Sequence, residues 1–250
     1  MIEFLRNLGF PIKPSFVIDS RETLEKAAES FGILPFFPNN IKGLSVEEMC
    51  APGMLFGGNY DEGCWEWKGP VIRKRRAAYG KFFRRKAGFV SLDLLPDFLN
   101  YRRNIYPVKE GSTEEMLLDI IKENDSLSST ELKRLIFGKQ DRTLWNDFPG
   151  MENNIGFPLS ERKGKKSLES PLQRLQMGGW IIISDFEYKL TKQGERYGWG
   201  VARYSTPEIV FGDLENISGR NEKESLDYII KTVAQRWRAG SKKAFEILLK

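Results

Sequence analysis

Three carboxylates beside two tryptophans are the side chains of this sequence best suited to general acid or base chemistry. Asp61, Glu62 and Glu66 lie next to Trp65 and Trp67 in the segment DEGCWEWKG. A carboxylate surrounded by aromatic rings can have a raised pKa, which lets it exchange a proton near neutral pH. The alternative interpretation is that the three acids are solvated loop residues without a catalytic role.

The lack of histidine restricts the chemistry further. None of the 250 residues is a histidine, so the sequence cannot form a Ser-His-Asp or Cys-His nucleophile. The two cysteines, Cys50 and Cys64, are too few for a disulfide framework, and a zinc site would need two further ligands. We therefore expect buried thiols, no metal and no cofactor. An enzyme would have to use carboxylates, lysines or arginines.

Basic residues are concentrated in one part of the chain. The net charge is +5, yet residues 65–103 hold 11 Lys or Arg and only 3 Asp or Glu. The segment RKRRAAYGKFFRRK combines 8 cations with Tyr79, Phe82 and Phe83 and contains no acid. Cations neutralise phosphates and rings stack on unpaired bases, so this composition favours a nucleic acid. The alternative is a basic surface whose rings belong to the core. The predicted contacts are Arg73, Lys74, Arg75, Arg76, Lys81, Arg84, Arg85 and Lys86.

Composition and hydropathy bound the class of protein. Hydrophobic residues make up 40% of the chain, which is enough for one large or two small domains with their own cores. No apolar run approaches the roughly 18 residues that a membrane helix needs. We expect a soluble, cytoplasmic protein without a membrane segment.

Capping signals place helices in the N-terminal part of the chain. Asp19 and Glu22 have the spacing of a capping box, and Gly32 suits a helix end, which predicts a helix at about 21–31. Ser45 and Glu48 repeat the capping pattern ahead of a second, short helix. Glycines dominate the following segment, which predicts a loop.

Three helix signals and two strand signals between residues 111 and 206 follow the order of a winged helix. Ser112 with Glu115 begins the first helix, and Ser128 with Glu131 begins the second at about 129–137. After an insertion of roughly 30 residues, SLESPLQRLQMGG predicts the third helix. The segments WIIISDFEYKL and RYGWGVARYS then flank a turn at Gly194, which predicts a β-hairpin, the wing.

The third helix of this unit has one apolar face, formed by Leu168, Leu172 and Leu175. Gly178 suits its C-terminal end. Its start has two alternatives: a cap at Ser167 puts Pro171 in the first turns, and a cap at Ser170 puts Pro171 at the first helical position.

Polar residues occupy the outward face of this helix and the hairpin that follows it. The helix presents Lys166, Ser170, Gln173 and Arg174. Gln and Arg are side chains that read adenine and guanine edges in the major groove. Cations of the hairpin suit phosphate contacts, and they are Lys189, Lys192, Arg196 and Arg203. The alternatives are an ordinary solvated helix face and charges that keep an exposed hairpin soluble.

We predict an α+β fold with three regions. Residues 111–206 form a winged helix-turn-helix unit, residues 1–110 form an additional α/β region, and residues 207–250 form helices that pack on the core. Thr206 and Pro207 begin a short helix, and a longer one lies near 221–238. A second, degenerate winged helix in the N-terminal region is one alternative, although the sequence contains no visible internal repeat.

Three segments resemble a bacterial protein family related to AlkZ. They are CWEWKGP, AYGKFFRRKAGFVSLDLLPDFLNYRR and LQMGGWIIISDFEYKLTKQGERYGWGVARYSTPE, and the third also resembles the winged-helix segment of the wider superfamily. AlkZ is an alkylpurine DNA glycosylase built from tandem winged helices and a β-barrel, so the resemblance implies DNA binding and suggests base excision. Such glycosylases use two glutamines that alternate along a strand. In this sequence no two glutamines are separated by one residue.

These observations predict a DNA-binding winged-helix protein with a role in DNA repair or genome maintenance, whose partner is duplex DNA, including damaged duplex. One alternative is a metal-independent, glycosylase-like enzyme that acts on a base turned out of the double helix. Another is a module whose winged helix binds protein. This last alternative predicts an apolar or buried outer face on the third helix.

Overall fold

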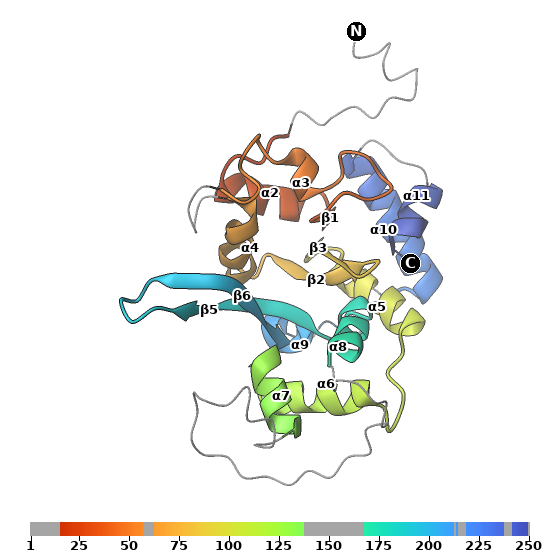
Figure 1. The fold of residues 1–250 in the computed structure, drawn as a ribbon. Coiled ribbons are helices and arrows are strands. Elements are labelled where there is room, and N and C mark those ends of the chain that lie inside the picture. Colours follow the sequence, from red (N-terminus) through yellow and green to blue (C-terminus); the bar gives the residue numbers. More distant parts are fainter. Residues whose placement is uncertain are drawn as a thin grey trace.

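The fold is described by a computed structural model covering residues 16–57, 63–137, 168–212, 214, 219–237 and 242–249. Helices and small antiparallel sheets alternate along the chain in an α+β arrangement (Figure 1). Within the described residues, no helix is long and apolar enough to cross a membrane.

The first sheet belongs to what we call the N-terminal unit. Its elements follow the order helix, strand, helix, helix, strand, strand. Strand β3 lies in the middle of the antiparallel sheet, between β1 and β2. The elements are α2 (Arg21–Ser30), β1 (Ile33–Pro35), α3 (Val46–Met49), α4 (Cys64–Arg73), β2 (Ala77–Phe83) and β3 (Lys86–Ser91).

The second sheet belongs to the central unit, which repeats this order of elements. Its last strand, β6, again lies in the middle of the sheet, between β4 and β5. The two units therefore share one connectivity, although no repeat is visible in the sequence. The elements are α6 (Thr113–Glu123), β4 (Leu127–Ser128), α7 (Ser129–Phe137), α8 (Glu169–Met177), β5 (Ile182–Leu190) and β6 (Arg196–Ser205).

Among the described residues, four further helices lie outside the two units: α5 (Leu95–Ile105), α9 (Pro207–Phe211), α10 (Glu222–Trp237) and α11 (Lys242–Leu249). Helices α10 and α11 lie beside α5 and the N-terminal unit (Figure 1). Their apolar residues join the larger of two hydrophobic clusters, which also contains α2, β2, β3 and α5. A smaller cluster fills the space between α6, α7 and α8.

Several predicted helix ends are confirmed because local hydrogen bonds determine them. The Ser128 hydroxyl accepts the Glu131 amide at 3.2 Å, and the Glu131 carboxylate accepts the Ser128 amide at 2.7 Å, which completes the predicted capping box. Ser112 and Ser45 cap α6 and α3 in the expected places. Thr206 likewise caps α9, with proline at its first turn.

The predicted start of α2 at residue 21 is confirmed, but the capping residues of α2 and α8 differ from the prediction. Helix α2 is capped by Ser20, whose hydroxyl accepts the Thr23 amide, because Thr23 rather than Glu22 completes the box. Helix α8 begins at Glu169 after Leu168, without a side-chain cap. Ser170 therefore lies inside the helix. Pro171 follows it in the first turn, where a missing backbone N–H costs nothing because that group would have no intrahelical acceptor. Ser167, the other proposed cap, lies outside the described residues.

One buried arginine connects four of these elements. Arg102 on α5 is fully buried. Its Nε donates to the Met177 carbonyl at 2.5 Å, its Nη2 donates to the Phe82 carbonyl at 3.0 Å, and its Nη1 donates to the Leu249 carbonyl. These carbonyls belong to α8, β2 and α11, respectively. Arg102 therefore fixes α8 relative to the N-terminal unit.

Replacing Arg102 by methionine should lower the free energy of unfolding by about 3 to 5 kcal/mol, because two buried carbonyls and one partly buried carbonyl lose their donor. Urea unfolding followed by circular dichroism measures the change. The matched control is Arg21→Met, at an exposed position of α2. A midpoint for Arg102→Met equal to that of the control would show that the buried contacts contribute nothing to stability.

Candidate nucleic-acid interface

The inward face of α8 is fixed by apolar packing and by one buried amide. Leu172, Leu175 and Gln176 are all buried. The Gln176 side chain donates to the Leu172 carbonyl at 3.2 Å and accepts the Lys81 backbone amide at 3.1 Å. The second bond satisfies a donor on β2, so the packed side of α8 is attached to the N-terminal sheet.

The outward face of α8 is polar, as the leucine spacing predicts. Ser170 and Arg174 are exposed and Gln173 is half-buried. Arg174 forms a long ion pair, 3.8 Å, with Glu114 on α6, and half of its side chain remains exposed. Lys166, the fourth predicted residue of this face, lies outside the described residues. Three of the four predicted side chains are therefore brought together on one surface.

The β5–β6 hairpin projects beyond the body of the molecule (Figure 1). Its turn is closed by a bond from the Thr191 amide to the Glu195 carbonyl at 2.8 Å, and Gly194 takes a φ of 84°, as the predicted turn requires. Lys189 and Lys192 are exposed near this turn. The Arg196 guanidinium lies over the Tyr188 ring, 4.6 Å from its centroid.

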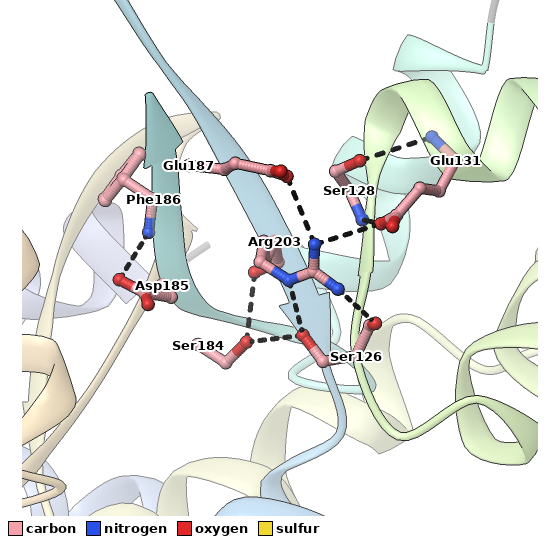
Figure 2. Close-up of polar contacts among 8 residues, drawn as sticks. All are labelled: Ser126, Ser128, Glu131, Ser184, Asp185, Phe186, Glu187 and Arg203. Carbon is pink, nitrogen blue, oxygen red and sulfur yellow. Dashed lines mark hydrogen bonds and ion pairs between the residues drawn. The ribbon is translucent and has the colours of Figure 1, made fainter. Parts of the chain in front are cut away.

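Arg203 lies at the base of the hairpin and not near its tip. Figure 2 shows its guanidinium between Ser126, Glu131 and Glu187. It donates to the Ser126 carbonyl at 2.7 Å and lies 3.1 Å from each of the two carboxylates. Glu131 also caps α7, so this network joins the hairpin to α7. These contacts make Arg203 a residue that positions the hairpin.

The predicted basic stretch is divided between the two ends of β2. The turn at Arg75 precedes the strand and the turn at Arg84 and Arg85 follows it, and all three arginines have positive φ. Since β2 has 7 residues, its ends are about 20 Å apart at roughly 3.3 Å per residue. The stretch therefore does not form one continuous basic surface.

Several cations of this stretch contact neighbouring protein groups. Arg73 pairs with Asp185 on β5 at 2.8 Å. Lys74 and Arg76 both approach Glu25 on α2, at 2.9 and 3.6 Å. Of the remaining lysines, Lys86 donates to a backbone carbonyl at 3.0 Å and Lys81 is half-buried. Arg75, Arg84 and Arg85 are exposed.

The predicted stacking of bases on the rings of this stretch is wrong. Tyr79, Phe82 and Phe83 are at most 2% exposed. Both faces of β2 are covered, because α8 and β5 pack on the strand in addition to the core of the N-terminal unit. The alternative interpretation, in which these rings belong to the core, is correct.

Of the three candidate acids, only Glu66 lies within the described residues; Asp61 and Glu62 lie outside them. Glu66 accepts a hydrogen bond from the Tyr188 hydroxyl at 2.6 Å. Burial, together with this carboxylate, raises the pKa of Tyr188. The pair joins α4 to β5, and a hydroxyl next to a carboxylate is an arrangement capable of proton transfer.

The two cysteines do not form a metal site with Glu66 or with other acids of the described residues. Cys64 is buried and Cys50 half-buried, with their Sγ atoms 2.7 Å apart. Burial raises the pKa of both thiols. Among the residues that the structure describes, no three potential Cys, Asp or Glu ligands lie close enough to hold a metal ion.

Lys68, on the same helix as Glu66, is a buried charged residue that the sequence patterns did not predict. It is 3% exposed. Its Nζ lies 3.8 Å from the Trp65 ring centroid and 4.6 Å from that of Phe186, and donates to the Trp65 carbonyl. Burial lowers its pKa to about 8. The only sequence signal was a single lysine among the aromatic residues of CWEWKGP.

One known protein family matches most of the chain. The family model described as AlkZ related matches residues 18–250. The chain belongs to the AlkZ-related family. Comparison with curated proteins and with solved structures gives no significant match.

The glutamines of this AlkZ-related chain differ from the alternating pair of the glycosylases. None of the described strands contains a glutamine. Gln173 and Gln176 lie on helix α8, and the amide of Gln176 is buried between α8 and β2. Gln176 therefore has a structural role in this member of the AlkZ-related family.

Replacing Lys68 by methionine in the AlkZ-related protein should raise the free energy of unfolding at pH 7 by about 1 to 3 kcal/mol. The folded-state pKa of about 8 lies below the ordinary value of 10.5, so the unfolded chain binds the extra proton between these values. Stability of the unsubstituted protein should therefore rise with pH from about 8 to 10.5. The advantage of the variant should shrink over the same interval.

Urea unfolding at several pH values measures this effect. The control is Lys231→Met, at an exposed position of α10. If Lys68→Met and the control have the same pH dependence, the burial of this ammonium group does not affect stability.

Proposed function

We propose that residues 113–205 form a winged helix that binds duplex DNA, with α8 in the major groove and the β5–β6 hairpin along the phosphate backbone. The order of elements and the central position of β6 support this assignment. Membership in the AlkZ-related family supports a role in DNA repair.

The observation that carries the proposal is the polar outer face of α8 directly before a protruding, cationic hairpin. Gln173 and Arg174 have the chemistry to read base edges, and Lys189 and Lys192 can contact phosphates. A winged helix that binds protein would be expected to present an apolar or buried surface here. The polar, solvent-facing side chains favour DNA.

The corresponding helix of the N-terminal unit, α4, is unsuited to enter a groove. Strand β5 covers it through the Glu66–Tyr188 hydrogen bond, the Arg73–Asp185 ion pair and the packing of Phe186 on Lys68. We therefore assign groove recognition to the central unit and a supporting role to the N-terminal unit.

Changing Lys189 and Lys192 together to serine should weaken binding to duplex of random sequence and reduce its salt dependence. Each lost phosphate contact should lower the slope of log K against log salt by about 0.9, so by about 1.8 for both. Changing Gln173 and Arg174 to alanine should leave this binding nearly unchanged. It should weaken binding to sequences selected from a randomised library by about 1 to 3 kcal/mol per base contact.

Fluorescence anisotropy at several salt concentrations measures both effects, with Lys231→Ser on α10 as the control for loss of an exposed lysine outside the proposed interface. Equal slopes for the hairpin variant and the control, together with full affinity of the α8 variant for selected sequences, would exclude this interface.

A second candidate function is metal-independent processing of a damaged base. It is favoured by the family relationship and by the Glu66–Tyr188 pair beside the buried Lys68 amine. Burying an ammonium group opposes stability, and strongly perturbed groups are concentrated at functional sites. In this function, Glu66 would be the general acid or base.

Incubation with alkylated duplex DNA tests this second function. Released bases are expected from the unsubstituted protein and should be lost in Glu66→Gln, which keeps the side-chain shape but not the charge. Glu195→Gln, in the exposed hairpin turn, should retain activity. No release by the unsubstituted protein on any alkylated substrate would leave DNA binding as the function.

A further inference from the structure

The outer part of the β5–β6 hairpin carries an exposed tryptophan that contacts a second one. Trp199 is 70% exposed, the largest fraction among the large apolar side chains of the described residues. Its ring meets the edge of Trp65 at a centroid distance of 5.6 Å, and Phe56, itself 56% exposed, lies 5.9 Å from Trp65. We call Phe56, Trp65 and Trp199 the aromatic cluster.

The backbone of β6 departs from regular pairing at Trp199. Glu187 pairs with Val201 and Lys189 pairs with Tyr197, so only Tyr188 on β5 lies opposite three residues of β6: Gly198, Trp199 and Gly200. Such bulges redirect side chains and are frequent next to functional sites. Here the bulge presents Trp199 beside α4.

Both glycines beside Trp199 are required by this geometry. Gly198 has a φ of 72°, a conformation that other residues rarely adopt. A Cβ on Gly200 would come within 2.9 Å of the Tyr188 ring. The sequence Gly-Trp-Gly thus maintains a local distortion whose result is an indole left largely in water, although burial of that ring would have stabilised the fold.

The surroundings of the aromatic cluster determine which ligand suits it. The Trp65 ring packs against the buried Phe36 ring, with 5.6 Å between their centroids, and the Lys68 amine lies over it. The exposed Lys189 and Lys192 extend from the same hairpin. Exposed aromatic rings and cations carried by one element are a combination that binds unpaired bases through stacking and their phosphates through charge.

We propose that the aromatic cluster is a stacking site for an unpaired base of DNA, with Trp199 and Phe56 as its contact surfaces. Bases in an intact duplex are stacked on each other, so only a base that is unpaired or turned out of the helix can lie against these rings. This inference rests on the proposed DNA binding and adds to it a preference for DNA that contains an unpaired nucleotide.

The test compares a fully paired duplex with the same duplex carrying one unpaired thymine, at one salt concentration. The unsubstituted protein should bind the second DNA more tightly. Trp199→Ala should weaken binding to the duplex with the unpaired thymine about 5- to 150-fold, the range for one stacked base, and leave binding to the paired duplex nearly unchanged. Trp199→Phe should retain most of the preference because it keeps a stacking ring.

The matched control is Tyr197→Ala, which removes another exposed ring of β6 that lies outside the aromatic cluster. Its preference for the unpaired thymine should be unchanged. Circular dichroism verifies that each variant is folded.

Two results would overturn the inference: no preference in the unsubstituted protein, or equal losses on both DNAs for Trp199→Ala. The proposed winged-helix interface fails separately, if the Lys189 and Lys192 variant binds paired duplex like the unsubstituted protein. Loss of the thymine preference in Trp199→Ala with intact duplex binding supports the stacking site.

Discussion

The buried guanidinium of Arg102 is the contact on which the arrangement of the two units depends. Two of its three acceptors are the last carbonyls of helices α8 and α11, groups that have no intrahelical donor and carry the negative end of the helix dipole. The third belongs to β2. Burial lowers the Arg102 pKa to about 10, which still leaves the side chain charged at neutral pH. One cation thus satisfies three elements that would otherwise bury unpaired oxygens.

The orientation of the proposed DNA-binding surface follows from this contact and two others. Gln176 attaches the inner face of α8 to the edge of β2, and Arg203 attaches the base of the hairpin to α7. Arg102, Gln176 and Arg203 are of residue types that are common at protein surfaces, yet their polar groups form hydrogen bonds to other parts of the protein. The residues left for the proposed DNA contacts are Gln173, Arg174 and the lysines near the hairpin turn, which these contacts leave on the outside.

Sequence patterns predicted the features that local interactions determine. The box of Ser128 and Glu131, the hairpin turn at Gly194 and the polar face of α8 all depend on residues close in sequence. Patterns failed where distant segments decide. Arg102 and Leu249 are 147 positions apart, and no local signal marks either as a partner. The basic stretch was read as one surface because its cations are sequence neighbours, whereas a buried strand separates them in space.

Strand β5 also couples the stability of the two units. Ile181, immediately before the strand, belongs to the smaller hydrophobic cluster, and Ile182 and Ile183 belong to the larger one. Neighbouring residues of one segment are thus shared between two cores, so neither core can open without exposing part of the other. A ligand that binds the hairpin should therefore raise the free energy of unfolding of both cores together, so the two units should unfold in one cooperative step.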